Sequence, residues 1–446
     1  MAFTSAEPPS AAAAVDPRVD PAAPPGGVPT NGNEPPRAPA SYVWMVVAAT
    51  FGVYMAFVTP IAYSLAVKVS QLAPDNEEYL GYVTGAGGVA AVLAAPFFGR
   101  LSDRTRSRLG RRRPYFIAGT VIGVLALVIM ASAPSMVVLG VGWVLAQASW
   151  GTILSLLLAS QADRLPMSQR GRVAGLSGIV QQLAPVTGVL LSGALIGNNL
   201  LLFLVPGVVG VVAMTLFVLL VREPDSRGLD LPSEPLSLSS MVRTYTFSPR
   251  RNPDFAWNWF GKFLFVIGLT FNTTFTTFFL ADRMDATVEE VAGLVAVLGG
   301  AGVVAGMLGA IGGGFLSDRL RRRKAFVLAG AVVFSAGVVL MAMTHSMPLI
   351  ITGAVLGTFG IGMFSAVDQA LALDVLPERE TDAGRYTGIY GFSTSIPQAI
   401  APLIAPLFLA VGASGGDKNY TLLYLVAAAF TLAGGLVVVL RVKSVR

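Results

Sequence analysis

The sequence predicts an all-α polytopic membrane protein in which twelve transmembrane helices form two pseudo-symmetric six-helix bundles. Three observations predict this fold class. The 446 residues are 54% hydrophobic and only 13% charged, with a mean hydropathy of +0.68, which is more apolar than a soluble domain. Long apolar segments alternate with short arginine-rich connections. Two motifs also recur at nearly the same spacing in the two parts of the chain.

Composition excludes several classes of function. The chain has no cysteine, which excludes disulfides, thiolate metal sites and cysteine nucleophiles, and its single histidine, His345, leaves no room for a histidine metal centre. The formal net charge of +6 lies in short loops between apolar segments, so it indicates membrane orientation rather than nucleic-acid binding. We therefore expect no metal, no cofactor and no nucleic-acid partner.

Residues 1–41 are expected to form a disordered cytoplasmic tail. Ten prolines fall within Met1–Ala40, beside several alanines and glycines and little aliphatic bulk. Such a segment buries too little apolar surface to offset the chain entropy lost on folding. It is not expected to be a secretory signal, because it lacks a basic region followed by a short apolar core and a small-residue cleavage site.

The rest of the chain divides into twelve apolar segments, each long enough to cross the hydrocarbon core as a helix of about 20 residues. A first half, residues 42–221, contains six of them: Val43–Val67, Leu80–Leu101, Tyr115–Ala133, Met136–Ser160, Val173–Ile196 and Leu200–Val221. A polar cytoplasmic linker, residues 222–254, precedes a second half, residues 255–446. That half contains Phe255–Ala281, Val288–Phe315, Ala325–Thr344, Met347–Leu373, Tyr386–Val411 and Tyr420–Leu440.

Positive charge falls on alternate connections. The second, fourth, sixth, eighth and tenth connections carry 7, 3, 5, 5 and 2 Lys or Arg residues when Arg100 is counted with its loop. The others hold little beyond Lys68, Arg283 and Lys418. Because loops rich in Lys and Arg stay on the cytoplasmic side, both termini are expected in the cytoplasm. We expect a multi-pass protein of the plasma membrane, which is the inner membrane in a bacterium.

Two motifs repeat between the halves. Residues Gly99–Arg104 match Gly314–Arg319 at an offset of 215 residues. Residues Asp163–Gly178 resemble Asp374–Gly391, and their shared G-R-x-x-G-x-x-G block is offset by 213 residues. Two independent matches at nearly one offset predict a duplicated six-helix unit.

Two parallel six-helix halves form an architecture in which transport sites lie between the halves. Here the chain resembles the major facilitator superfamily over all but its tail. The family pattern Gly-x-x-x-Asp-Arg, followed by Gly and basic residues, is matched by Gly99, Asp103, Arg104, Gly110, Arg111 and Arg112. The longer form S-D-R-T-R-S-R-L-G-R-R-R-P is most similar to the loop of sucrose/proton symporters and of glycoside-pentoside-hexuronide cation symporters. The resemblance implies the major facilitator fold and points towards sugars or glycosides.

Charged residues of the cytoplasmic loops are candidates for a latch between the halves. A carboxylate at such a position can accept hydrogen bonds from the free N–H groups that begin another helix. The resemblance implies that Asp103 faces Arg385 at the start of the eleventh span, and the repeat extends this to Asp318 and Arg172. The alternative is that these charges only fix topology. The latch candidates are Asp103, Arg104, Arg111, Arg385, Asp318, Arg319 and Arg172.

Two charged residues fall inside apolar segments, Lys262 in the seventh and Asp368 in the tenth. A lone charge in a bilayer costs about 3 kcal/mol or more on insertion scales, so each is expected to have a partner or an aqueous cavity. Both lie some two turns from the cytoplasmic end, so they are placed to pair. We expect Asp368 to take up a proton and Lys262 to be its counter-charge. A permanent structural ion pair is the alternative, and without acids in the first six spans proton coupling depends mainly on Asp368.

Polar and aromatic stripes mark candidate contacts for a solute. The seventh segment carries Asn258, Lys262 and Asn272 on one helical face, and the fourth carries Gln147 between two tryptophans. Rings and amides suit a sugar, whose C–H faces stack on rings while its hydroxyls take directed hydrogen bonds. Packing is the alternative role for the tryptophans. The substrate-binding candidates are Tyr54, Gln147, Trp150, Asn258, Asn272 and Gln369.

Prolines inside the fifth and eleventh segments are candidate bending points, because an interior proline removes a backbone hydrogen bond and kinks a helix. The hinge candidates are Pro185, Pro397 and Pro402, and static kinks are the alternative. Glycine-rich stretches at residues 85–88 and 299–302 are expected to allow close contact between helices.

The sequence best fits a secondary transporter that moves a small organic solute by alternating access, with a sugar or glycoside as the best estimate and proton coupling expected. Two alternatives remain. One is an exporter of amphipathic drugs or metabolites, and the other is a non-transporting membrane receptor or enzyme. An enzyme is not expected, because no nucleophile-base pair, metal set or nucleotide loop occurs. The expected partners are the solute, protons and the lipid bilayer, with the chain acting as a monomer.

Overall fold

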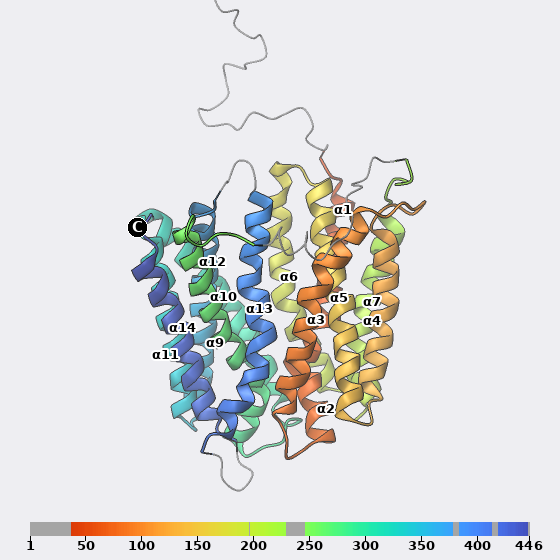
Figure 1. The fold of residues 1–446 in the computed structure, drawn as a ribbon. Helices are drawn as coiled ribbons and strands as arrows, with labels where there is room; N and C mark the ends of the chain where they lie inside the picture. The colour runs from red at the N-terminus through yellow and green to blue at the C-terminus, as the bar shows by residue number, and fades with distance from the viewer. Residues whose placement is uncertain (1–36, 196, 229–245, 378–382, 413–417, 445–446) are drawn as a thin grey trace, which may run out of the picture.

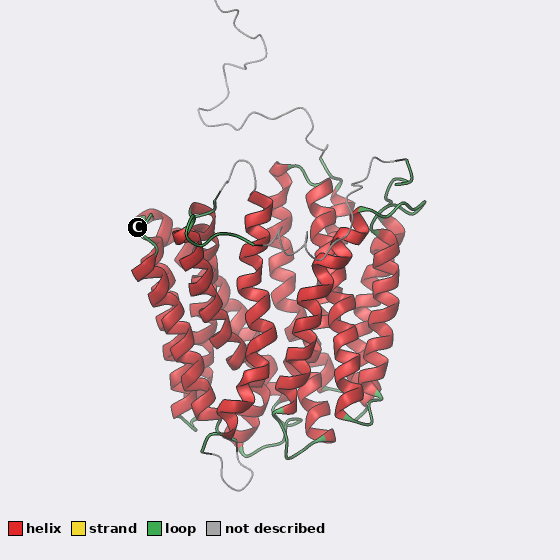
Figure 2. Cartoon of the chain, in the orientation of Figure 1, coloured by secondary structure: helices red, strands yellow, loops and turns green. Residues whose placement is uncertain are grey.

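The computed structural model describes residues 37–195, 197–228, 246–377, 383–412 and 418–444, and within these ranges all regular secondary structure is helical (Figure 2). The predicted tail as far as residue 36 and the middle of the predicted linker, residues 229–245, lie outside the described residues. Twelve described helices are long and apolar enough to cross a membrane, as the sequence predicts.

The first half contains α1 (Ala40–Thr59), the π-helix η1 (Pro60–Ser64), α2 (Leu65–Leu72), α3 (Tyr79–Asp103), α4 (Arg113–Ala131), α5 (Met136–Arg164), α6 (Met167–Gly193) and α7 (Asn199–Leu220). The second contains α9 (Pro253–Met284), α10 (Ala292–Leu320), α11 (Arg323–Met343), α12 (Met347–Asp374), α13 (Ala383–Ala410) and α14 (Tyr420–Arg441). These helices match the twelve predicted segments to within a few residues at most ends.

Local sequence explains where several helices begin and end. Asn198 and Asn419 each accept a hydrogen bond from a backbone N–H of the first turn that follows, at 2.9 and 2.8 Å, and so cap α7 and α14. Arg321 after α10 and Asp285 after α9 adopt the left-handed conformation that ends a helix, with φ of 51° and 50°.

The first span is one continuous helix interrupted by a π turn, which the sequence did not predict. Pro60 has no backbone N–H and its ring excludes the normal contact with the carbonyl four residues earlier. The chain instead forms the turn Pro60–Ser64, in which the N–H of Leu65 bonds to the carbonyl of Pro60. The carbonyl of Ala62 within this turn accepts a hydrogen bond of 3.0 Å from Thr277 of α9.

The helices form two groups of six spans, as predicted, with the first group in red to yellow-green and the second in green to blue (Figure 1). In the first group α1 packs on α6 and α7, and α5 packs on α3 and α4. In the second group α12 packs on α10 and α11, while α14 packs on α9 and α11. Both described ends of the chain lie at the same end of the bundle, here called the near end, and the opposite end is the far end.

The two halves meet at the far end through glycine-lined helix faces. A Cβ added at Gly81 of α3 would collide with the carbonyl oxygen of Pro402 in α13, and one added at Gly85 would collide with the side chain of Leu403. The equivalent contact joins α6 and α10, where a Cβ at Gly299 would lie 3.0 Å from Val186. Glycine permits this close approach, as the glycine-rich stretches predict.

The same helices have open space beside their near-end glycines. An added Cβ would meet no atom within 4 Å at Gly99 of α3, at Gly171 and Gly175 of α6, or at Gly391 of α13. In addition, four hydrogen bonds or ion pairs that join the halves all lie at the far end: Thr277–Ala62, Tyr63–Glu289, Tyr420–Glu77 and Lys418–Glu78. The structure is therefore a conformation closed at the far end.

Candidate functional site

The two charged residues predicted inside the membrane contact each other. The Nζ atom of Lys262 in α9 lies 3.4 Å from the Oδ2 atom of Asp368 in α12. The Asp368 side chain is 1% exposed and that of Lys262 is 17% exposed. The pair joins two helices that are far apart in sequence, and it satisfies the requirement that a buried charge have a partner.

Two further side chains complete this cluster. The hydroxyl of Tyr390 in α13 donates a hydrogen bond of 2.6 Å to Oδ1 of Asp368. Asn258, one helical turn before Lys262, donates from Nδ2 to the Tyr390 hydroxyl at 3.0 Å. The Lys262 ammonium also lies 4.2 Å from the centre of the Tyr390 ring, a cation–π distance. We call Asn258, Lys262, Asp368 and Tyr390 the C-half network.

The C-half network holds one carboxyl group between a cation and a phenol. Each oxygen of Asp368 has one partner, Lys262 on Oδ2 and Tyr390 on Oδ1. A buried carboxylate that pairs with one ammonium group is chemically able to accept a proton, and doing so would release the ammonium from its partner. The Lys262 side chain is partly exposed, whereas that of Asp368 is almost completely buried.

The candidate solute contacts of the first half lie mainly in its interior. Gln147 of α5 is 6% exposed. Trp150 is fully buried, and a Cβ added at Gly123 of α4 would lie 2.5 Å from its ring. Trp150 thus occupies a packing position, and its side chain presents no surface to a solute in this conformation. Trp143 packs in the same way against Gly87 of α3.

The remaining solute candidates differ in burial. Tyr54 of α1 is half-buried, and Gln369 of α12 is exposed beside the buried Asp368. Asn272 of α9 is also half-buried, and its Nδ2 atom is buried without a hydrogen-bond partner among the described residues. Asn258 belongs to the C-half network, so its amide already has a polar partner. The role of all six in solute binding stays a prediction.

The charged loops form a similar ion-pair arrangement in each half. In the first half Arg112 bridges Asp103, at 3.4 Å, and Asp163, at 2.9 Å, while Arg111 lies 3.1 Å from Asp163. In the second half Arg323 bridges Asp318, at 3.1 Å, and Asp374. Each bridging arginine therefore joins the end of α3 or α10 to the end of α5 or α12.

In this conformation the ion pairs of the predicted latch lie within each half. Asp103 and Asp318 contact arginines of their own halves, and Arg385 donates a hydrogen bond of 2.7 Å to the carbonyl of Thr246. Arg172 and Arg319 are exposed, and Arg104 lies at the end of α3. In a structure closed at the far end, the helices of the two halves are apart at the near end. A latch between the halves at the near end therefore stays a prediction for another conformation.

The hinge candidates lie inside continuous helices, close to the contacts between the halves. Pro402 itself faces Gly81, and Pro397 lies two residues before Ala399, which faces Gly88. Pro185 of α6 precedes Val186, which faces Gly299. Their positions put any bend next to the interface, while the hinge role itself stays a prediction.

Sequence reasoning missed Tyr390, Asp163 and Asp374. Asp163 and Asp374 begin the repeated segments D-R-L-P and D-V-L-P, so the repeat alone could have paired each with its loop arginine. Tyr390 lies between two glycines of the repeated glycine block. Because tyrosine is uncharged, it did not stand out within an apolar segment as Lys262 and Asp368 did.

Twelve membrane-length helices in two six-span halves, closed at one end and with a buried ion pair in one half, define a multi-pass membrane transporter. The sequence profile described as Major Facilitator Superfamily matches residues 40–313 and 304–446. The chain belongs to this superfamily.

Individual relatives are distant and match only short parts of the chain. A general alpha-glucoside permease of Schizosaccharomyces pombe is 33% identical over 88 residues, which is 20% of this chain and 14% of that protein. The membrane-associated transporter protein of Homo sapiens is 36% identical over 98 residues, 22% of this chain and 18% of that protein. The chain thus matches less than a fifth of the length of either relative.

Solved structures share the fold at low identity. A mutant form of the nucleoside transporter NupG has a TM-score of 0.74 at 11% identity, covering 90% of this chain and 100% of that one. A bacterial homologue of the human lysosomal transporter Spinster, in an inward-facing and unoccupied conformation, has a TM-score of 0.66 at 15% identity. That match covers 91% of this chain and 96% of the other, and both matches concern the fold alone.

Proposed function

We propose that this protein is a proton-coupled secondary transporter that moves a small organic solute, a sugar or glycoside in the first instance, by alternating access. The observation that carries the proposal is the C-half network. A buried carboxyl with one ammonium partner and one phenol donor is a suitable place to load and release a single proton. Its location in one half of a two-half transporter fold links protonation to the packing of α9, α12 and α13.

Four features support the solute class and the topology. The loop motif Ser102–Pro114 is similar to that of sugar symporters, and the matched permease is named for alpha-glucosides. Asn272 offers a buried amide donor without a partner among the described residues. The positive-inside distribution supports a near end in the cytoplasm, both termini included, and a far end outside. We further propose the plasma membrane as the location and the monomer as the working unit.

An exporter of amphipathic drugs or metabolites is the second candidate. It is favoured by the burial of Gln147 and Trp150, which leaves few polar contacts for a sugar in the first half. The two candidates differ in how uptake responds to Gln147→Leu and Asn272→Leu. A sugar transporter loses affinity for its solute, whereas a carrier of apolar compounds is little affected.

Uptake into proteoliposomes tests the proposal. The purified protein is offered a panel of labelled sugars, glycosides, nucleosides and amphipathic cations, with and without an inward proton gradient. We expect the gradient to drive accumulation of a sugar or glycoside. Asp368→Asn should abolish this accumulation but allow exchange of labelled for unlabelled solute, because exchange needs no net proton movement.

The exposed linker carboxyl of Asp225 provides the matched control, since it pairs with Arg227 and Asp225→Asn removes a charge outside the C-half network. If Asp368→Asn accumulated solute as well as Asp225→Asn did, proton coupling through Asp368 would be wrong. If no sugar or glycoside entered and an amphipathic compound did, the second candidate would replace the first.

A further inference from the structure

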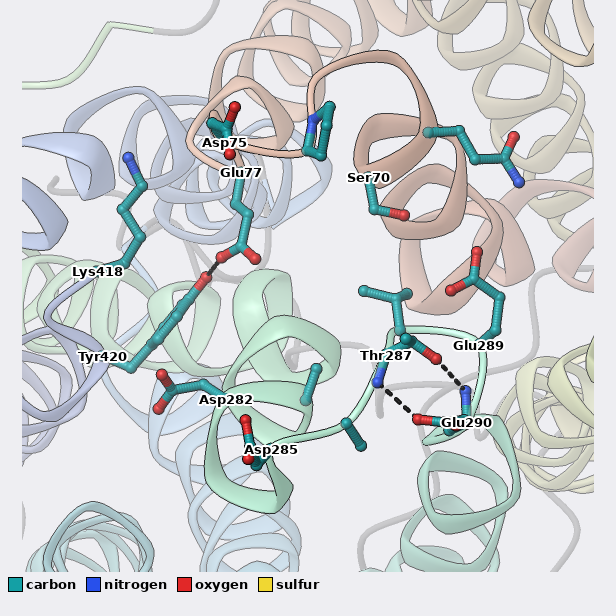
Figure 3. A pocket seen from close by; sticks show the side chains of 15 residues that line it. Ser70, Asp75, Glu77, Asp282, Asp285, Thr287, Glu289, Glu290, Lys418 and Tyr420 are labelled. Atoms are coloured by element: carbon teal, nitrogen blue, oxygen red, sulfur yellow. Dashed lines mark hydrogen bonds between the residues drawn. The ribbon is translucent and has the colours of Figure 1, made fainter. Parts of the chain in front are cut away.

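A pocket of about 680 Å³ opens at the far end between the two halves (Figure 3). Its walls come from the loop between α2 and α3, from the end of α9 and the loop after it, and from the start of α14. Carboxylates dominate it, and Lys418 is its one cation among the described lining residues. The acidic lining residues are Asp75, Glu77, Asp282, Asp285, Glu289 and Glu290.

One polar contact of this pocket crosses from one half to the other. The hydroxyl of Tyr420 at the start of α14 donates a hydrogen bond to Oε2 of Glu77, and Figure 3 shows the two side chains pointing at each other. Tyr420 is 2% exposed. Beside it, Lys418 lies 2.8 Å from Glu78, the neighbour of Glu77. The Tyr420–Glu77 and Lys418–Glu78 contacts join the two halves at the far end, where α3 and α13 also pack together.

We propose that Glu77 and Tyr420 form a pH-sensitive latch of the far-end gate, which holds the gate closed more firmly as the medium on that side becomes acidic. Closure places the Glu77 carboxyl, partly buried, against the hydroxyl of Tyr420, and opening would return it to water. A proton on Glu77 removes the cost of burying its charge and leaves an oxygen that still accepts from Tyr420. The proposal concerns the gate alone and holds whatever the solute is.

The charges around Glu77 agree with this direction. Burial raises the pKa of Glu77, the hydrogen bond from Tyr420 lowers it, Asp282 raises it, Lys418 lowers it and Glu78 raises it, with a net rise. These groups come from α9, α14 and both adjoining loops. In the open gate the same carboxyl faces water and has an ordinary pKa, so the closed gate binds the proton more tightly. By linkage, closure is therefore favoured as the pH falls through the raised pKa and weakened above it.

Spin-label distances test the latch in the full-length protein in lipid nanodiscs. The chain has no cysteine, so Val137→Cys in the first half and Val411→Cys in the second, both exposed, give one label pair across the far end. Between pH 8 and pH 5 we expect the ratio of short to long distances to rise, by at most about tenfold per pH unit for one proton.

Two variants and two controls separate the outcomes. Glu77→Gln should hold the gate closed throughout this range and abolish the pH response, while Tyr420→Phe should lower the closed share at every pH. Asp75→Asn, an exposed change in the same loop, should respond as the wild type does. His345, the single histidine of the chain, bonds Arg283 at 2.8 Å at the same end, so His345→Gln serves as a further control and should leave the response intact. A normal response in Glu77→Gln, or an unchanged closed share in Tyr420→Phe, overturns the proposal.

Because these measurements contain no solute, their failure would leave solute transport untouched. Conversely, a protein that responds to pH through Glu77 but accumulates nothing in proteoliposomes would retain the latch and lose the proposed function.

Discussion

The two halves of the protein are alike in their loops and different in their centres. Arg112 and Arg323 each bridge two aspartates at corresponding positions of the repeat. Inside the membrane-spanning segments, by contrast, the second half contains the ion pair of Lys262 and Asp368, whereas the first half holds the neutral, buried side chains of Trp143, Gln147 and Trp150.

This difference indicates how the two copies of a duplicated unit can keep the same loop contacts and yet take different roles in their interiors. The loops keep the same ion pairs because both halves need the same ties between neighbouring helix ends. Under the proposed function, the centres differ because a proton site requires a buried ionisable group, and one such site is enough to couple one proton to one cycle. We infer that the second half handles the proton, while the first half provides a neutral wall against which it moves.

The largest expected effect comes from replacing Lys262, the cation of the C-half network. Lys262→Met leaves Asp368 buried without a counter-charge and should lower the free energy of unfolding by about 3–5 kcal/mol. The double variant Lys262→Met/Asp368→Asn should recover most of that loss. Gln147→Met in the first half removes no charge and should cost about 1–3 kcal/mol at most. Thermal unfolding in detergent measures all three, and a double variant as unstable as Lys262→Met would contradict the comparison.

A smaller effect is expected from the phenol of the C-half network. Tyr390→Phe removes the donor to Asp368 and should cost about 1–3 kcal/mol, the usual penalty for a buried polar group left without its partner. The matched change in the first half is Tyr54→Phe, which removes a hydroxyl with no side-chain hydrogen bond described for it. Unfolding of the two variants, measured side by side, should show a loss only for Tyr390→Phe. Equal losses would show that the network stabilises no more than ordinary packing does.

The smallest effect is expected for Arg323, because the two loop arginines differ in burial. The Arg112 side chain is 6% exposed and that of Arg323 is 26% exposed. Arg112→Ala should therefore destabilise by about 1–3 kcal/mol, and Arg323→Ala by about 0–1 kcal/mol, as for a solvent-screened ion pair. Repeating the unfolding measurement at high salt should reduce the second loss further. The opposite ranking would mean that the loops are less alike than their ion pairs indicate.

Hydropathy and repeats predicted the twelve spans and the fold class because the bilayer imposes length and composition on every spanning helix. The Lys262–Asp368 pair was also foreseeable, since two isolated charges at one depth in different spans have few other partners. The spans could be predicted from hydropathy alone and the ion pair from charge alone, and both properties can be read directly from the sequence.

Features that depend on three-dimensional packing were not foreseeable in the same way. The spacing of Trp143, Gln147 and Trp150 defines one helical face, but the glycines of neighbouring helices decide that the two tryptophans are packed away. Tyr390 joined the C-half network through α13, which no charge or periodicity connects to α9. The π turn at Pro60 depends on hydrogen-bond register, to which hydropathy is blind.

That π turn changes the angular phase between the two parts of the first span, that is, the direction in which their side chains point around the helix axis. Each residue of an α-helix advances the chain by about 100° around the axis, so a turn with wider hydrogen-bond spacing changes the phase of everything beyond it. Before the turn α1 packs on α6 and α7 of its own half, and within it Ala62 and Tyr63 contact the other half. The turn thus places the last part of the span in a different angular phase from its first part, with Ala62 and Tyr63 against the other half.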